Sequence, residues 1–197
     1  ALAVPGAVRV FDAAGYDPVI IETVGVGQVE VDVAGTADTT VVVVTPGWGD
    51  AVQANKAGLL EVADVFVVNK ADRPGANDAR RDLELMLDLS HVTGQEDDTG
   101  YRPPIVMTTA LDGSGAPEVW EAVEAHAAHL ADTNTLVSRR SDRLRMEVQN
   151  RVEQLLERQT DEALASDEGS KLLRLATERT VSPAEASRQL TDRILGR

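Results

Sequence analysis

Short runs of β-branched and aliphatic residues, separated by stretches of helical character, constrain the fold of this chain more than any other feature. None of the runs shows the polar alternation of a strand with one exposed face. They lie at residues 19–21, 41–44, 65–68 and 105–107. The segments of helical character lie at residues 7–14, 50–63, 77–89 and 118–130. Strands and helices that alternate at this spacing predict an α/β fold with a parallel sheet buried on both faces.

A change of charge near Ser138 divides the chain into two predicted domains. Residues 1–138 contain 22 acidic and 7 basic side chains, whereas residues 139–197 contain 11 acidic and 12 basic ones. The second domain has no strand-like run, and its apolar residues recur at spacings of three and four, as in an amphipathic helix. We therefore predict a helical arm over residues 139–197, with Ser182-Pro183 at the start of its last helix. The arm either packs on its own sheet or exchanges with a second subunit, because narrow apolar stripes alone make a thin core.

Net charge and cysteine content exclude several classes of function. The 197 residues carry a formal charge of −14, which repels nucleic acid and anionic membrane over most of the surface. The absence of cysteine rules out disulfides, thiolate metal sites and a cysteine nucleophile, and it fits a reducing compartment. No apolar run approaches the roughly 20 residues of a membrane helix, and the first residues lack the basic start of a signal peptide. We therefore expect a cytoplasmic protein that binds neither nucleic acid nor membrane.

The sequence Asn69-Lys70-Ala71-Asp72, directly after the run at residues 65–68, is the strongest functional signal. Loops at the carboxyl ends of parallel strands are where such sheets bind ligands. The Asp72 carboxylate can accept hydrogen bonds from both the ring N–H and the exocyclic amino group of guanine, a pattern that adenine does not offer. Asn69 would tie neighbouring loops together, and the aliphatic stem of Lys70 would cover the purine face. The alternative is a turn that caps a helix.

A second loop supports a guanine pocket. Thr108-Thr109-Ala110 follows the run at residues 105–107, and a small residue there lets a backbone N–H approach the guanine carbonyl oxygen. We assign Thr109, Ala110 and Leu111 to the same pocket as the preceding loop, because the two loops follow neighbouring predicted strands.

The third element is Glu22-Thr23-Val24-Gly25, which closes the run at residues 19–21. An acidic residue at the end of a buried strand can hold a water molecule on a nucleotide-bound magnesium ion. A glycine three residues later lets its N–H meet the γ-phosphate, as in the switch loops of GTPases. The alternative for Glu22 to Gly25 is a glycine-rich turn between a strand and a helix.

Five stretches together resemble the MeaB/ArgK family of P-loop GTPases, which chaperone cobalamin-dependent acyl-CoA mutases, chiefly methylmalonyl-CoA mutase. They are ETVGVGQ at residues 22–28, ADTT at 37–40, PGWGD at 46–50, QANKAG at 53–58 and ADVFVVNKAD at 63–72. The resemblance implies GTP or GDP with Mg²⁺ as ligands, and Glu22 in place of the aspartate usual in this switch motif. It also implies a third mobile loop, with Asp50 and Lys56 as its charged residues, and dimerisation through residues 139–197.

One departure from the family pattern is the phosphate-binding loop. Such a loop needs Gly-Lys-Ser or Gly-Lys-Thr, but the three lysines follow Asn55, Asn69 and Ser170. We therefore expect the phosphate loop to lie upstream, in a longer protein of which this sequence is the C-terminal part.

The switch motif also bears on the rate of hydrolysis. Val26 stands where small signalling GTPases keep the glutamine that orients the attacking water. Gln28 reaches the site only if the loop reorganises. We therefore predict slow intrinsic GTP hydrolysis, with Glu22, Gly25 and Gln28 as the catalytic residues and a partner that accelerates it. Arg9, Arg73 and Arg102 are expected to be ordinary surface charges.

The sequence leaves three alternative functions: a GTPase that delivers a metal, a kinase of a transport system and a structural dimer that binds no nucleotide. GTPases that deliver metals usually carry histidine- or cysteine-rich sites, and here only His126 and His129 share a helical segment; ordinary surface histidines are the alternative. A kinase of a transport system would need a phosphoacceptor or a second substrate pocket, which the sequence does not supply. A nucleotide-free structural dimer is the last possibility.

Overall fold

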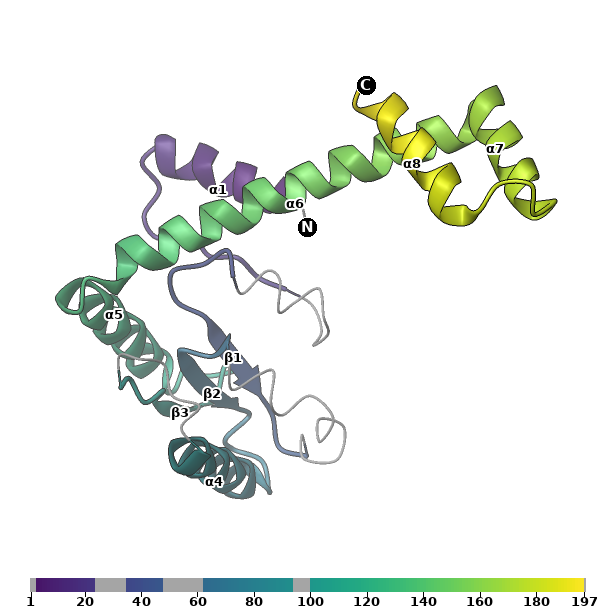
Figure 1. The fold of residues 1–197 in the computed structure, drawn as a ribbon. Coiled ribbons are helices and arrows are strands. Elements are labelled where there is room, and N and C mark those ends of the chain that lie inside the picture. The colour runs from purple at the N-terminus through teal and green to yellow at the C-terminus, as the bar shows by residue number, and fades with distance from the viewer. Residues whose placement is uncertain (1–2, 24–34, 48–61, 94–99, 197) are drawn as a thin grey trace. The chain divides into compact units, whose positions relative to one another are not determined.

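The computed structural model of the chain describes residues 3–23, 35–47, 62–93 and 100–196 (Figure 1). The chain divides into two compact units, Ala1–Ser141 and Asp142–Arg197. The division falls inside one long helix, α6 (Thr135–Ala165), which starts in the first unit and ends in the second. The other described elements of the first unit are α1 (Ala3–Ala13), β1 (Val41–Val44), β2 (Val65–Asn69), α4 (Ala76–Thr93), β3 (Ile105–Thr108) and α5 (Ala116–Asp132).

The three strands form one parallel sheet in the order β1-β2-β3. Val41 of β1 lies opposite Val65 of β2, and Phe66 of β2 lies opposite Ile105 of β3. In the central strand every residue from 65 to 68 is buried, with at most 4% of its surface exposed. Three of the four predicted strands are thus confirmed, and with them the parallel α/β fold.

Helix α4 closes the core of the first unit. Its buried residues recur every three or four positions, so they form one apolar face that packs on the sheet. These residues are Ala76, Ala79, Leu83 and Leu87. They meet Val44, Phe66 and Val68 in a single cluster. Helix α5 packs on β2 and β3 as well, and Figure 1 shows α4 and α5 on either side of the strands. Full burial of a side chain such as Phe66 or Leu83 stabilises the fold by about 1.5–3 kcal/mol.

Two expectations about the sheet are wrong. Residues 19–21 form no strand, and the Ile20 side chain is 81% exposed. A strand needs a neighbour to take up its backbone N–H and C=O groups, and no strand of the described part of the chain lies beside these residues. In β1, Val43 is 56% exposed, so this strand is not buried on both faces. Successive residues of a strand face opposite sides of the sheet: Val44 packs in the core cluster with α4, whereas Val43 faces the other side and is not part of that cluster.

The second unit is helical, as predicted. After α6 come α7 (Asp167–Thr177) and α8 (Pro183–Ile194), which pack on each other. Ser182 caps α8: its hydroxyl accepts a hydrogen bond from the backbone N–H of Glu185 at 3.1 Å, and Pro183 follows it. Gly169 is buried at the turn from α6 to α7, where a Cβ atom would lie 2.1 Å from the carbonyl oxygen of Ala163. Only glycine lets the two helices approach so closely.

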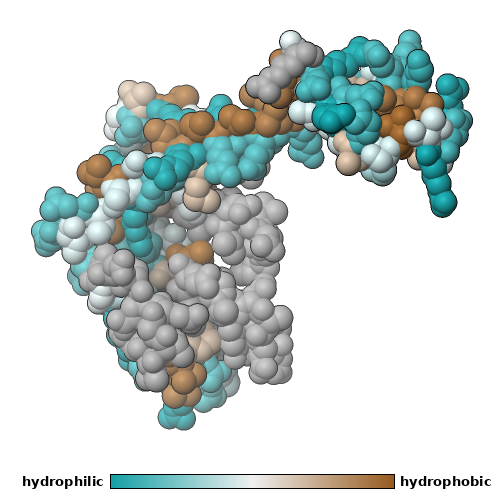
Figure 2. All heavy atoms as spheres, viewed as in Figure 1, coloured by the Kyte–Doolittle hydropathy of each residue, from teal (hydrophilic) through white to brown (hydrophobic). Residues whose placement is uncertain are grey.

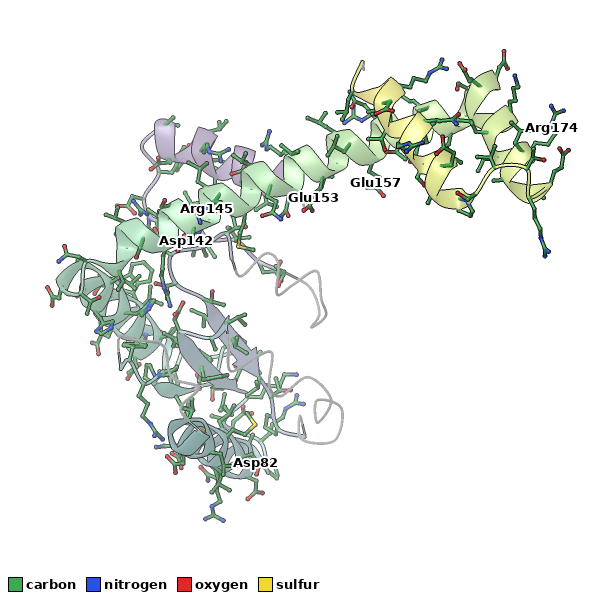
Figure 3. The ribbon with its side chains drawn as sticks, in the orientation of Figure 1. Asp82, Asp142, Arg145, Glu153, Glu157 and Arg174 are labelled. Carbon is green, nitrogen blue, oxygen red and sulfur yellow. The ribbon has the colours of Figure 1, made fainter. Side chains whose placement is uncertain are left out.

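Helix α6 presents an apolar stripe to the surface of this unit (Figure 2). The stripe is formed by residues spaced three or four apart, each 44–55% exposed: Leu144, Val148, Val152, Leu155 and Leu156. Charged side chains fill other positions of the helix, among them Asp142, Arg145, Glu153 and Glu157 (Figure 3). Among the described residues no helix is both long enough and apolar enough to span a bilayer.

Candidate functional site

The carboxyl ends of β2 and β3 bring two predicted loops together. Asn69, the last residue of β2, lies opposite Thr108, the last residue of β3. The loops that follow line one pocket of about 230 Å³. The lining residues are Asn69, Lys70, Asp72, Arg73, Thr109, Ala110 and Leu111. All six residues assigned to the base from the sequence therefore lie side by side. Arg73, expected to be an ordinary surface charge, lines the same pocket; its position next to Asp72 is the signal for it.

Asn69 holds the two loops to each other. Its Oδ1 atom accepts hydrogen bonds from the backbone N–H of Lys70 at 2.7 Å, the backbone N–H of Ala110 at 3.2 Å and the Thr108 hydroxyl at 3.3 Å. The N–H of Ala71 donates to the Thr108 carbonyl oxygen at 2.9 Å, which adds a second tie. Lys70 adopts a left-handed conformation with φ of 60°, which is costly for a residue with a Cβ atom. The bond from its N–H to Asn69 helps to offset that cost.

The loop after β3 is closed by its own hydrogen bonds. Thr109 and Ser114 form a bridge, in which the Thr109 N–H donates to the Ser114 carbonyl oxygen at 2.9 Å. The N–H of Ser114 in turn donates to Asp112 Oδ1 at 2.9 Å, and this bond lowers the pKa of the Asp112 carboxyl. Gly115 then starts α5 with φ of 80°, packed so tightly that a Cβ atom would lie 2.1 Å from the Met107 carbonyl oxygen. The backbone that presents Thr109 and Ala110 to the pocket is therefore fixed on both sides.

The pocket has the size and chemistry of a site for one part of a ligand. Pockets for a whole drug-sized molecule usually measure about 300–1,000 Å³, and this one is smaller. Lys70, Asp72 and Leu111 are exposed at its rim, with Leu111 93% exposed. A flat heterocycle placed there would meet the Asp72 carboxylate, the Lys70 stem and the backbone N–H groups of the second loop.

The remaining predicted residues lie elsewhere or outside the described residues. Glu22 is exposed in the irregular segment after α1. Gly25, Gln28, Asp50 and Lys56 fall on residues 24–34 and 48–61, outside the part of the chain that the structure describes. The grouping of a catalytic site from Glu22, Gly25 and Gln28 therefore stays a prediction.

A second group of polar residues lies at the other end of the strands, before β1 and β2. His126 of α5 is 1% exposed; its Nε2 atom lies 3.2 Å from Asp64 Oδ1 and its Nδ1 atom 2.9 Å from the Thr39 hydroxyl. The expectation of an ordinary surface histidine is therefore wrong for His126, because Asp64 and Thr39 satisfy its ring nitrogens in the interior. Within the described residues, no three His, Cys, Asp or Glu side chains are grouped to hold a metal ion.

The pKa of Asp64 reflects these contacts. Burial alone raises the pKa of its carboxyl. Hydrogen bonds from His126 and from the backbone N–H of Thr40 outweigh that effect, together with electrostatic interactions with His126 and Arg139, and leave the pKa of Asp64 below its ordinary value of 3.8. Asp64 is thus held as a carboxylate at the base of the sheet.

Comparison with known proteins points to one family. The family model described as "Methylmalonyl Co-A mutase-associated GTPase MeaB" matches residues 2–165. A relative from Pyrococcus abyssi is 38% identical over 190 residues, which are 96% of this chain and 58% of the relative. The GTPase ArgK of Escherichia coli is 33% identical over 192 residues, which are 93% of this chain and 55% of ArgK. The chain thus spans little more than half the length of these curated relatives.

A mammalian relative and a solved structure extend this result. The mouse protein named methylmalonic aciduria type A homolog, mitochondrial, is 31% identical over 134 residues, or 68% of this chain and 32% of that protein. A crystal structure described as an LAO/AO transport system kinase superposes with a TM-score of 0.70 at 28% sequence identity. That match covers 97% of this chain and 61% of the other, so nearly all of this chain has a counterpart in that structure.

Proposed function

Because the chain belongs to the MeaB family of methylmalonyl-CoA mutase-associated GTPases, we propose that it carries the guanine-recognition part of a GTP-binding and GTP-hydrolysing chaperone. The chaperone acts in the cytoplasm on a cobalamin-dependent acyl-CoA mutase, methylmalonyl-CoA mutase being the first candidate. GTP turnover would gate the loading of the cofactor into that mutase or the protection of the loaded enzyme. The ligands are GTP and GDP with Mg²⁺.

The pocket after β2 and β3 carries this proposal. Asp72 lies at its rim, and Asn69 fixes both loops around it through three hydrogen bonds. Guanine offers two adjacent donors, its ring N–H and its amino group, to a carboxylate. Adenine offers a ring acceptor at the same place, which a carboxylate repels. The pocket therefore favours guanine over adenine, and the carboxylate of Asp72 is the group that discriminates.

The variant Asp72→Asn tests the base assignment. An amide in this place loses one acceptor and gains a donor, so it should favour xanthine, which has a carbonyl oxygen where guanine has the amino group. A hydrogen bond to a charged group contributes about 1.5–3 kcal/mol, so we expect GDP affinity to fall about 10- to 100-fold and XDP affinity to rise. Both affinities are measured by calorimetry on the longest form of the protein that its cells produce. Asp82→Asn, at an exposed position of α4 (Figure 3), is the matched control. Unchanged GDP affinity in Asp72→Asn would remove Asp72 from the site.

Hydrolysis requires groups beyond the base pocket. We infer that Glu22 holds a water molecule of the magnesium shell and that the Gly25 N–H meets the γ-phosphate. An exposed carboxylate suits this cation, which prefers oxygen ligands. The ion, when bound, neutralises charge on the phosphates. Gln28 orients the attacking water after the loop reorganises, while Asp50 and Lys56 act in the third mobile loop.

We also propose that residues 139–197 join two copies of the chain. The support is the exposed apolar stripe of α6, whose five residues recur at helical spacing. A stripe of this kind is typical of helices that pair with another helix.

A second candidate function comes from the description of the solved relative as a transport system kinase. In that case the γ-phosphate would pass to a protein instead of to water. Incubation with γ-labelled GTP and a candidate acceptor protein separates the two functions, because label on protein supports the kinase and labelled free phosphate supports the GTPase.

A further inference from the structure

The helical second unit has a pocket of its own, at the junction of α6, α7 and α8. Its volume is about 280 Å³. The lining residues are Gln159, Glu162, Ala163, Ser166, Arg193 and Ile194. Three of them come from the last two turns of α6, one is the N-cap of α7, and two come from the last turn of α8. One wall of the pocket therefore belongs to the helix that carries the exposed apolar stripe.

The wall that α6 contributes continues this stripe (Figure 2). Seven residues make about two helical turns, so residues seven apart lie on one face. Gln159 comes seven residues after Val152, and Glu162 comes seven after Leu155. With two earlier residues they form a line whose members are alternately three and four residues apart, and we call it the α6 seam: Arg145, Val148, Val152, Leu155, Gln159 and Glu162. This spacing is the heptad pattern of helices that pair side by side.

The α6 seam is exposed and carries opposite charges at its two ends. All six of its side chains are exposed. Arg145 and Glu162, the end residues, form no salt bridge or side-chain hydrogen bond with any residue that the structure describes. Between them lie four uncharged residues, three of which are aliphatic. The seam thus has a positive end, an apolar middle and a negative end.

Reversal of the α6 seam makes it complementary to itself. When two copies of α6 run in opposite directions with Val152 opposite Leu155, Val148 lies opposite Gln159 and Arg145 lies opposite Glu162. The twofold symmetry of such a pair forms every contact twice. Opposite charges then meet at both ends of the seam, and the aliphatic side chains meet in its middle.

The charges disfavour the other arrangements of two paired helices. In a parallel pair Arg145 would face Arg145 and Glu162 would face Glu162, so like charges would repel at both ends. In an antiparallel pair shifted by one heptad, Arg145 would face Leu155 or Glu162 would face Val152, and a charge would lose water without gaining a partner. Polar side chains in a seam select orientation and register in this way, at some cost in stability.

The pocket offers room for one side chain of the second copy. Leu144, beside the α6 seam, is 55% exposed. In the antiparallel register it lies opposite Ala163, a small residue of the pocket lining. A large aliphatic side chain that enters the space beside a small one is the knobs-into-holes packing of paired helices. Apolar surface of Leu144 is then removed from water next to the place where Arg145 meets Glu162.

We propose that this pocket is the docking site for the segment around Leu144 of a second copy, which binds with α6 antiparallel and with its Arg145 paired to Glu162. The proposal rests on the proposed dimerisation through residues 139–197 and gives that contact its orientation, its register and the charges that select them. Each copy offers one pocket and fills one, so two copies complete the assembly.

Reversal of each charge tests the docking, on the protein in its longest natural form. Arg145→Glu and Glu162→Arg each place like charges at both ends of the pair, so we expect either variant alone to raise the dimer dissociation constant about 10-fold or more in sedimentation experiments. In an equal mixture of the two variants, opposite charges face each other again in every mixed dimer. Mixed dimers should therefore form with a dissociation constant within about threefold of that of the unaltered protein.

Glu157→Arg is the matched control, because it makes the same reversal on the side of α6 opposite the seam (Figure 3). It should leave the dimer unchanged, and it should not restore association when mixed with Arg145→Glu. A dimer that neither seam variant weakens, or a mixture of the two without recovery, would overturn the docking and leave the dimerisation in place. An unaltered protein that stays monomeric would overturn the dimerisation, and the docking with it.

Crosslinking measures the register independently, because the chain has no cysteine. In the antiparallel register Val148 lies opposite Gln159, whereas the two copies of Val148 lie about 16 Å apart along the helix axis, too far for a disulfide. Mild oxidation should therefore join Val148→Cys to Gln159→Cys in a mixture and should join neither variant to itself. A disulfide formed by Val148→Cys alone would indicate a parallel pair and contradict the proposal.

Discussion

At the scale of single residues, Asp64 gives the clearest dependence of stability on pH. The pKa of its carboxyl is lower in the folded protein than the ordinary 3.8, so the unfolded chain takes up the proton more readily. The stabilisation is therefore fully present above pH 3.8 and is lost as the pH falls through the lower, folded pKa. We expect Asp64→Asn to reduce the free energy of unfolding by about 1–3 kcal/mol at neutral pH, and the gap to the unaltered protein to narrow below pH 3.8.

Urea unfolding from neutral pH down to about pH 2 measures this gap. Asp82→Asn is the control, because Asp82 is exposed on α4, and it should change the free energy of unfolding by less than about 0.5 kcal/mol throughout. A gap for Asp64→Asn that stays constant over the whole range would show that the charge of Asp64 does not stabilise the fold.

The loop from Asn69 to Asp72 and the contact between His126 and Asp64 show how far the surroundings of a single residue can be predicted from the sequence. The loop from Asn69 to Asp72 was predictable because its residues are contiguous and follow a strongly apolar strand. The contacts of Asn69 with Thr108 and Ala110 followed from the parallel order of the strands. His126 was mistaken for a surface residue because its burial depends on Asp64, 62 positions earlier in the chain. A pattern confined to one helix does not record such a partner.

At the scale of elements, Gly115 determines how closely α5 follows β3. Its φ of 80° is unfavourable for other residues, and a Cβ atom would lie 2.1 Å from the Met107 carbonyl oxygen and 3.0 Å from Thr108. Gly115→Ala therefore adds a backbone clash to the conformational cost, and we expect a loss of about 2–4 kcal/mol in the free energy of unfolding. Because the loop of Thr109 and Ala110 ends at this glycine, affinity for GDP should fall as well.

Gly113→Ala is the matched control for this prediction. Gly113 also has φ of 80°, but a Cβ atom there would meet no atom within 4 Å. It should lose only about 1 kcal/mol, the cost of the backbone conformation. Thermal or denaturant unfolding of the two variants compares them directly, and equal losses would mean that the contact with Met107 is unimportant.

The four apolar runs show why some strands can be predicted from the sequence and others cannot. The runs at residues 41–44, 65–68 and 105–107 became β1, β2 and β3, because each has a neighbour in register. The run at residues 19–21 has the same composition but no strand of the described chain beside it. Apolar composition favours a strand, whereas hydrogen bonds to a neighbour are what form one. The helices of the second unit were predicted from the spacing of their apolar residues and, for α8 alone, from the Ser182-Pro183 cap, because both signals are local.

At the scale of the whole molecule, the apolar stripe of α6 predicts self-association. Val148 belongs to this stripe and is 54% exposed. Val148→Glu would place a charge in the proposed contact and remove burial of about 1.5–3 kcal/mol, so we expect the dimer to dissociate about 10- to 100-fold more readily in sedimentation experiments. Met146→Glu is the control, because Met146 is 62% exposed and lies about 200° around the helix from Val148. Equal effects of the two variants would place the contact elsewhere.

The last prediction concerns the rate of GTP hydrolysis, which we expect to depend on the partner. The side chain of Val26 has no group that can hydrogen-bond to water, so in the proposed mechanism Gln28 orients the attacking water after its loop reorganises. If contact with the proposed mutase partner is what brings Gln28 into place, hydrolysis is slow in the isolated protein and faster in the complex. We expect single-turnover cleavage of GTP to rise at least about tenfold when the mutase is added, and Gln28→Ala to lose most of this rise while GDP affinity is retained. Cleavage that is already fast without the mutase would contradict this mechanism, because Gln28 would then be in place without a partner.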